Sequence, residues 1–239
     1  MKILHGALAH AAGAVLAMMA AVSASAQPYP NRPITIVLPF APGGGGDLLV
    51  RSISAKLEQR LGKPVVIESK PGAGGVIASN IVAKSAPDGY TLLMGTSSPL
   101  AINVTLYKSL PYNPGTDFIP VIDMARVPFV LVVNPSLPVK TVRELIEYAK
   151  ANPNKLSFGS SGVGSPGHLF MELFKSMTGT SMIHVPYKGT LPALRDAVAG
   201  HLQLMFCDVG PCRGQLESGA VRPLGIATKN RFVTVPNIP

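Results

Sequence analysis

The chain has few charged residues and very few cysteines. Only 14% of its 239 residues are Asp, Glu, Lys or Arg, tryptophan is absent, and Cys207 and Cys212 are the two cysteines. Two sulfur ligands without a second Cys or His pair at metal-binding spacing argue against a metal site, and we expect none. A disulfide across residues 208–211 and two separate thiols remain equal alternatives, because geometry decides between them.

Clustered basic residues are also absent. Lys and Arg outnumber Asp and Glu by 21 to 12, which gives a formal net charge of +9, but the basic residues are scattered singly. Nucleic-acid binding favours basic runs with interleaved aromatic residues, so we expect no nucleic-acid partner. The excess charge indicates either solvated faces or a weak field that attracts anionic ligands.

The sequence lacks the common nucleotide-binding and hydrolase motifs. Residues 43–48 do not fit G-x-G-x-x-G, no G-x-x-x-x-G-K-[ST] is present, and residues 159–163 miss G-x-S-x-G because a valine replaces the last glycine. Ser165, His168 and Asp208 could form a triad, but Ser165 and His168 are close neighbours at an expected helix start. We expect no catalytic residues and no cofactor, with an exported enzyme for a carboxylated substrate as the alternative.

The N-terminus carries the pattern of an export signal. Lys2 precedes an apolar stretch over residues 7–22, and Ala24-Ser25-Ala26 is an A-x-A cleavage site. A membrane anchor is the alternative, but the apolar stretch is short for a transmembrane span. We expect residues 1–26 to be a signal peptide that is cleaved after Ala26, and the mature chain to reside in the periplasm.

Strand and helix patterns alternate along the rest of the chain, which predicts an α/β fold with parallel-rich sheets flanked by helices. A long extended stretch over residues 118–134 separates two such sets and predicts two lobes. We expect the first lobe to contain residues 27–124 plus 225–239 and the second to contain residues 125–224. The expected strands are 34–40, 64–68, 90–95, 156–160, 182–187, 202–207 and 221–228, and the expected helices are 47–61, 74–85, 141–151, 166–178, 191–200 and 211–218.

Glycine- and serine-rich loops follow several of these strands. Ligands of open α/β sheets bind beyond the carboxyl ends of the strands. After the first strand, Gly43 to Gly46 expose backbone N–H groups, and Asp47 is expected to cap the next helix, so this loop predicts an anion site. A plain tight turn is the alternative for this loop, and a plain N-cap is the alternative for Asp208. The strand-end logic points to Gly43, Gly44, Gly45, Asp47, Ser97, Ser98, Ser160, Ser161, Gly164, Ser165, His168, Tyr187 and Asp208.

Several stretches together resemble the Bug (TctC-like) family of periplasmic receptors for tripartite tricarboxylate transporters. They are residues 29–44, 68–75, 86–93, 112–120, 160–169, 185–189 and 192–194. The resemblance implies a two-lobed, type II-like periplasmic-binding-protein fold that closes on a small carboxylate. It also implies that Phe40 to Gly46 and Ser160 to His168 hold carboxylate groups, while Ser97, Ser98 and Asp208 contact the rest of the ligand.

The resemblance further implies an extracytoplasmic receptor that captures a dicarboxylate or tricarboxylate, an acidic amino acid or an aromatic acid. Such a receptor works as a monomer and contacts the membrane subunits of its transporter transiently. The chain departs from the family pattern because it stops at residues 235–239, where family members continue back into the first lobe. We therefore expect an incomplete first lobe, with a truncated, non-functional remnant of the receptor as a further alternative.

Overall fold

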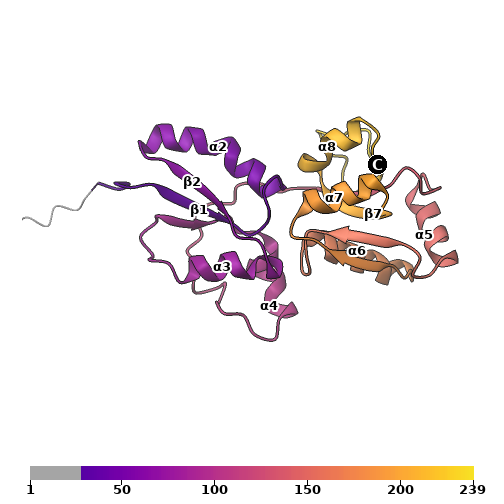
Figure 1. The fold of residues 1–239 in the computed structure, drawn as a ribbon, viewed down its shortest axis with the longest axis horizontal. Helices are drawn as coiled ribbons and strands as arrows, with labels where there is room; N and C mark the ends of the chain where they lie inside the picture. The colour runs from indigo at the N-terminus through magenta and orange to yellow at the C-terminus, as the bar shows by residue number, and fades with distance from the viewer. Residues whose placement is uncertain (1–27) are drawn as a thin grey trace, which may run out of the picture.

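The described chain folds into two α/β lobes that face each other across a cleft (Figure 1). The structure is a computed structural model and describes residues 28–239. A three-stranded sheet forms the centre of the first lobe, and a five-stranded sheet forms the centre of the second. The expected signal peptide and its cleavage site after Ala26 lie outside the described residues.

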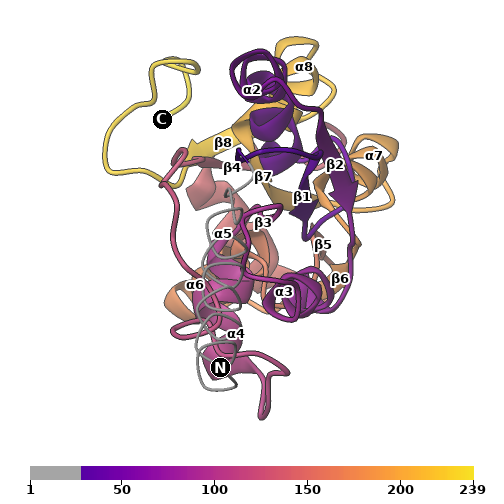
Figure 2. The same cartoon turned by 90° about the vertical axis from the view of Figure 1, so that its left-hand side faces the viewer.

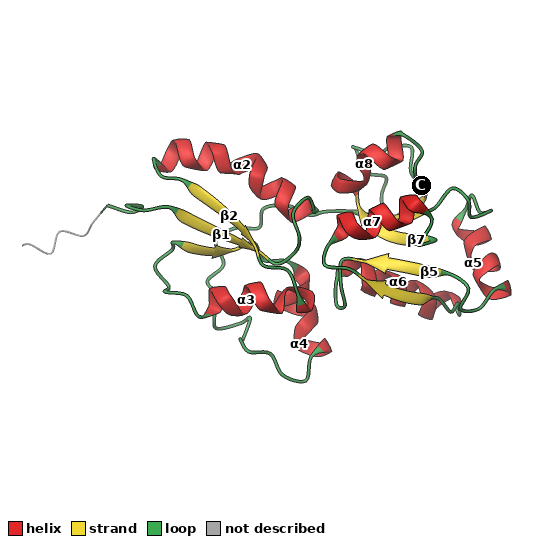
Figure 3. Cartoon of the chain, viewed as in Figure 1, coloured by secondary structure: helices red, strands yellow, loops and turns green. Residues whose placement is uncertain are grey.

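The first sheet is entirely parallel and has the strand order β2-β1-β3. Helices cover it on both sides, as expected for a parallel sheet (Figure 3). The sheet contains β1 (Ile34–Leu38), β2 (Val65–Ser69) and β3 (Thr91–Leu93), and its long covering helices are α2 (Gly45–Leu61) and α3 (Val76–Ala83).

Three short helical segments complete the first lobe beside the cleft. They are η1 (Ala73–Gly75), η2 (Ser98–Ile102) and α4 (Asn103–Leu106), and η2 runs directly into α4. The sequence patterns did not predict η2 and α4, because nine residues that contain a proline carry little helical periodicity.

The second sheet mixes parallel and antiparallel strands in the order β6-β5-β7-β4-β8. Neighbours among β5, β6 and β7 are parallel, whereas β4 runs antiparallel to both β7 and β8. The strands are β4 (Phe129–Val133), β5 (Ser157–Ser160), β6 (Ile183–Pro186), β7 (Leu204–Asp208) and β8 (Arg222–Ile226). The helices are α5 (Val142–Ala151), α6 (Pro166–Thr178), α7 (Thr190–Ala199) and α8 (Val209–Glu217).

The central strand β4 shows why this sheet needs helices on both faces. Val130 and Val132 pack into a cluster with residues of α7 and α8, while Leu131 and Val133 pack into a cluster with residues of α5 and α6. Successive side chains of a strand point to opposite faces, so the run of five apolar residues is buried from both sides. Extended residues without strand pairing precede β4, so only the end of the expected stretch 118–134 is a strand.

The C-terminal segment belongs with the second lobe, which corrects the expectation that residues 225–239 return to the first. β8 pairs with β4, and the Ile226 N–H donates to the Pro239 carbonyl at 2.8 Å. Ile238 is buried in the cluster that α7 and α8 share. The apolar residues of this segment therefore find a core in the second lobe, and residues 28–239 cross between the lobes once, through the segment before β4 (Figure 2).

Candidate ligand-binding cleft

A cavity of about 500 Å³ lies between the two lobes. The first lobe lines it with the loop after β1, the start of α2 and the residues after β3. The second lobe lines it with Ser161, Pro166, Thr190 and Asp208, and the segment before β4 closes one side. The cavity therefore lies at the carboxyl ends of the parallel strands, where the sequence pattern placed it.

Several helices begin at the cavity wall. Gly44 to Gly46 form the start of α2, and Thr96 and Ser97 precede η2. In the second lobe, Pro166 is the first residue of α6, Thr190 is the first residue of α7, and Asp208 precedes α8. The N-terminal N–H groups of a helix lack intrahelical partners and carry partial positive charge, so this convergence favours an anion in the cavity.

The glycine loop after β1 differs from the expectation in one respect. Helix α2 begins at Gly45, so Asp47 lies in its first turn and is not the N-cap. The Asp47 carboxylate accepts a hydrogen bond from the Gly43 N–H at 2.9 Å and pairs with Arg51 at 2.9 Å. Burial raises the pKa of Asp47, but the hydrogen bonds from Arg51 and Gly43 outweigh it, so the pKa is lowered. Asp47 therefore holds the glycine loop in place through the Gly43 N–H, and the Arg51 guanidinium compensates its negative charge.

Asp208 joins the two lobes at the cavity. Its Oδ2 accepts the Thr190 hydroxyl at 3.1 Å within the second lobe and the Gly45 N–H of the first lobe at 3.3 Å. Burial raises the pKa of the Asp208 carboxyl, although both hydrogen bonds act in the opposite direction. The chain's own carboxylate thus occupies one of the helix N-termini that would attract an anionic ligand.

The serines after β3 divide into one that lines the cavity and one that does not. Ser97 lines the cavity together with Thr96, whose buried Oγ1 has no hydrogen-bond partner within residues 28–239. Ser98, the first residue of η2, is fully buried and is absent from the lining. Thr96, which was not among the expected site residues, therefore offers an unused hydroxyl where Ser98 was expected to act.

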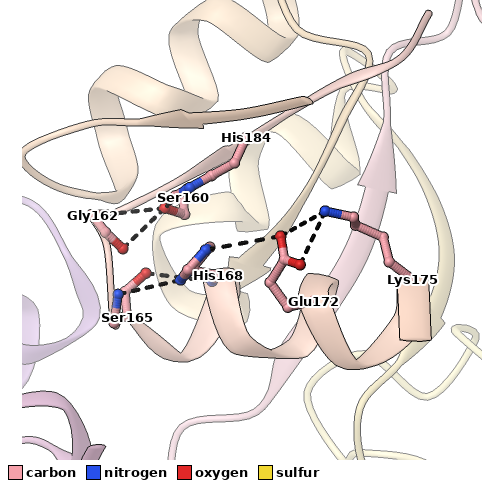
Figure 4. Close-up of polar contacts among 8 residues, drawn as sticks. Ser160, Gly162, Ser165, His168, Glu172, Lys175 and His184 are labelled. Carbon is pink, nitrogen blue, oxygen red and sulfur yellow. Dashed lines mark hydrogen bonds and ion pairs between the residues drawn. The ribbon is translucent and has the colours of Figure 1, made fainter. Parts of the chain in front are cut away.

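The loop after β5 is held from behind by the residues expected to bind the ligand (Figure 4). Of this loop, Ser161 lines the cavity, whereas Ser160 and Ser165 are buried. Ser165 is the N-cap of α6, and its Oγ accepts the His168 N–H at 3.4 Å. Ser165 Oγ contacts the backbone of His168, and Asp208 Oδ2 is bonded to Thr190 and Gly45, so the three residues are not arranged as a triad.

Two stacked imidazoles lie behind the same loop. The ring centroids of His168 and His184 are 4.0 Å apart, and His184 Nε2 lies 2.7 Å from Ser160 Oγ (Figure 4). Burial lowers the pKa of His168, and burial together with the charge of His168 lowers the pKa of His184 to about 4. Both rings are therefore neutral at pH 7 and act as hydrogen-bonding groups.

Four further expected residues lie outside the cavity lining. Tyr187 donates its hydroxyl to Asp196 on α7 at 2.5 Å, and burial and this contact raise the pKa of Tyr187 to about 12. Gly43, Gly164 and His168 shape loops behind the wall. Of the fourteen expected residues, the structure brings Phe40, Gly44, Gly45, Asp47, Ser97, Ser161 and Asp208 to the cavity.

Arg126 is the most informative lining residue that the strand-end logic missed. It lies on the segment before β4 and is the single cationic side chain among the described lining residues. None of the ion pairs formed within residues 28–239 involves it. No strand end or loop motif marks this position in the sequence. The signal that could have found it is an arginine on the extended segment that connects the lobes.

Apolar side chains form much of the remaining wall. Phe40, Leu49, Met94, Val127 and Phe129 face the cavity. Within residues 28–239, no group of three or more His, Cys, Asp or Glu residues is placed to hold a metal ion, and no helix has the length and apolar character that a bilayer crossing requires. Cys207 and Cys212 are both buried free thiols.

Comparison with known proteins identifies relatives over most of the chain. Residues 49–239 match the sequence model of the tripartite tricarboxylate transporter family receptor. The protein BugT of Bordetella pertussis is 40% identical over 220 residues, which cover 92% of this chain and 68% of BugT. A protein encoded in the tcbD-tcbE intergenic region of Pseudomonas sp. strain P51 is 38% identical over 211 residues, which cover 88% of this chain and 62% of that protein.

Solved structures give the same result. An R. palustris protein solved with adipate superposes with a TM-score of 0.86 at 44% identity, over 88% of this chain and 71% of that one. MatC from Rhodopseudomonas palustris, solved with bound malate, superposes with a TM-score of 0.84 at 34% identity, over 88% of this chain and 72% of MatC. The two-lobed periplasmic-binding-protein fold expected from the sequence is confirmed.

Proposed function

Because the chain belongs to the family of tripartite tricarboxylate transporter receptors, we propose that its cleft binds a small organic carboxylate in the periplasm. The observation that carries this proposal is the convergence of helix N-termini from both lobes on one cavity that also contains Arg126. Related structures contain adipate and malate, which are both small dicarboxylates.

The polar and the apolar lining residues suit different parts of a carboxylate ligand. Four kinds of group are the donors for carboxylate oxygens: the N–H groups at the start of α2 other than that of Gly45, the hydroxyls of Thr96 and Ser97, the Ser161 hydroxyl and the Arg126 guanidinium. The apolar wall formed by Phe40, Met94 and Phe129 suits the carbon skeleton between or beside the carboxyl groups. We propose that the chain acts as a monomer, delivers this ligand to membrane transporter subunits in a transient contact, and catalyses no reaction.

Thermal unfolding with a panel of acids tests the binding proposal. The full chain is expressed with its leader in a Gram-negative host and purified from the periplasm, where its intact mass also reports whether cleavage follows Ala26. Melting is followed by circular dichroism, since the chain has no tryptophan. A bound acid at 100 times its dissociation constant adds about 2.7 kcal/mol, which raises the melting temperature by roughly 5–10 °C.

The uncharged diamides of the same acids serve as controls of equal size. A rise with adipate or malate and none with the diamides supports the proposal. If no monocarboxylate, dicarboxylate or tricarboxylate raises the melting temperature of a cooperatively unfolding chain, the proposal is wrong. Conversion of any acid by the purified chain would support the enzyme alternative.

A matched pair of arginine variants tests the site. Arg126→Gln should weaken binding of the preferred acid by about 10- to 100-fold, because a hydrogen bond from a charged donor is removed. Arg213→Gln removes an exposed arginine that pairs with Glu217 on α8 and should leave the affinity unchanged. Equal losses in both variants would point to a diffuse charge effect and would remove Arg126 from the site.

A further inference from the structure

The orientation of the His168 ring is fixed by a backbone hydrogen bond. The Gly164 N–H donates to His168 Nδ1 at 3.3 Å. An acceptor nitrogen carries no proton, so the neutral ring must be protonated on Nε2, which faces Glu172 Oε1 at 3.9 Å. The arrangement therefore needs the neutral imidazole in one particular tautomer.

The stacked histidines hold the loop at two points. His168 accepts from Gly164 in the middle of the loop, and its ring lies against His184, whose Nε2 contacts Ser160 Oγ at the end of β5. Ser160 Oγ in turn accepts the Gly162 N–H at 3.1 Å. The pair thus connects the loop over residues 160–166 to the interior of the second lobe.

This loop faces the cavity and the opposite lobe. Ser161 and Pro166 line the cavity. Gly164 has a φ of +77°, and a Cβ at this position would lie 2.7 Å from the Leu106 side chain and 2.8 Å from Asn103 Oδ1, both in the first lobe. A displacement of Gly164 would therefore change both the ligand-binding wall and the contact between the lobes.

We propose that His168 is a positioning residue that holds the ligand-binding loop through its unprotonated Nδ1, and that protonation of His168 releases the loop and weakens carboxylate binding. The part that concerns affinity rests on the proposed function. The part that concerns the loop does not, because it follows from the geometry of the ligand-free protein.

The charged groups around the ring set the direction of the effect. Glu172 and Lys175 face it from α6 and pair with each other at 2.8 Å, and His184 faces it from β6. Burial lowers the pKa of His168 more strongly than Glu172 raises it. The neutral ring therefore predominates at pH 7, and the loop is released as the pH falls through the lowered pKa of His168. A charged His168 disfavours protonation of the stacked His184 ring.

Two substitutions separate the hydrogen-bond acceptor from the titratable group. His168→Asn places an amide oxygen near the position of Nδ1, so the variant keeps an acceptor for Gly164 but cannot be protonated in this range. His168→Leu keeps the volume and loses the acceptor. His201→Asn is the control, because His201 is exposed and lies beside Asp196 on a different part of the second lobe.

Nitrogen NMR of the ligand-free wild-type chain tests the core of the proposal without any variant. We expect the His168 ring to carry its proton on Nε2, and the Gly164 amide shift to titrate with the same midpoint as His168. In His168→Asn, the Gly164 amide should not change between pH 5 and pH 8. A proton on Nδ1 at pH 7, or a Gly164 amide that ignores the titration of His168, would overturn the proposal.

Adipate affinity, measured by calorimetry at pH 7 and pH 5, tests the consequence. Wild type and His201→Asn should bind about two- to tenfold more weakly at pH 5, the range expected for one hydrogen bond. His168→Asn should show no such loss, and His168→Leu should be weak at both values. If adipate does not bind at pH 7, malate replaces it. A failure of every acid contradicts the proposed function, whereas the NMR result still decides the role of His168.

Discussion

Side chains in this cleft occupy hydrogen-bond donors of the protein itself as often as they offer donors to a ligand. Asp47 accepts from the Gly43 N–H and pairs with Arg51, and Ser165 caps α6. Asp208 accepts the Gly45 N–H across the cleft. Residue types that attract attention in a sequence because they could contact a ligand are here often the residues that hold the wall in place.

Replacement of Asp208 tests this view. Asp208→Asn keeps an oxygen acceptor for Gly45 and Thr190 but removes a buried negative charge from an anion-binding cavity. We expect the affinity for adipate to rise on the order of tenfold, because like charges in one site repel each other. Calorimetry at constant ionic strength measures this change. A weaker affinity would show that the ligand presents a positively charged or proton-donating group to Asp208.

The same variant has a predicted pH signature in stability. Burial raises the pKa of Asp208 in the folded protein, so binding a proton at this carboxyl favours the folded state. This stabilising contribution is complete below the unfolded pKa of about 3.9. This contribution is lost as the pH rises through the folded value. Asp208→Asn should therefore have a larger free energy of unfolding than wild type at pH 7, and the gain should shrink towards pH 3. Denaturant unfolding at both pH values measures the difference.

At the scale of the element, two helices begin with the same type of N-cap, but only one of them begins at the cavity. Thr141 caps α5 and accepts the Glu144 N–H at 3.1 Å. Ser165 caps α6 by the equivalent bond to His168. The start of α6 borders the cavity, whereas no residue of α5 is among those that line it.

This pair gives a matched test of the role of α6. Thr141→Ala and Ser165→Ala should each lower the free energy of unfolding by about 1 kcal/mol, the usual cost of a lost N-cap. Only Ser165→Ala should also weaken carboxylate binding, because it loosens the loop that carries Ser161. Denaturant unfolding and calorimetry on the two variants measure both effects. A similar loss of affinity in Thr141→Ala would mean that global stability, and not the loop, controls binding.

How far the sequence predicted these elements depended on local signals. The bounds of α6 were predicted to the residue, because Ser165, Pro166 and Gly179 mark its ends. Strand ends located the cleft, since the carboxyl ends of parallel strands meet at one edge. The strand at β8 was expected, but residues 225–239 were assigned to the first lobe, because an apolar run at the chain terminus does not reveal which sheet will pair with it. The place of Arg126 in the cavity wall depends on a side-chain direction that periodicity does not contain.

At the scale of the whole molecule, the two lobes have unequal cores. Two of the three hydrophobic clusters within residues 28–239 belong to the second lobe, and the third, around Val50, belongs to the first. The connecting segment exposes Ile119, Val121 and Ile122, each at least three-quarters exposed. The second lobe should therefore be the more stable unit, and the connection should be the accessible point between the two.

Limited proteolysis tests this asymmetry. Elastase should cut first near Val121 or Ile122 and leave a resistant fragment that extends to residue 239, while the first lobe is degraded. Mass spectrometry identifies the fragment, and a cooperative melt by circular dichroism shows that it is folded. Simultaneous loss of both lobes, or a resistant first lobe, would contradict the prediction.

The convergence of helix N-termini also has a practical consequence for solution work. A cavity bordered by several helix N-termini and the Arg126 guanidinium does not distinguish sharply between a metabolite and a polyvalent buffer ion. In citrate or phosphate, the apparent dissociation constant for any acid would be multiplied by one plus the ratio of the buffer concentration to its own dissociation constant. Affinities determined in such buffers would describe an exchange of anions, and the order of ligands could invert between one buffer and the next.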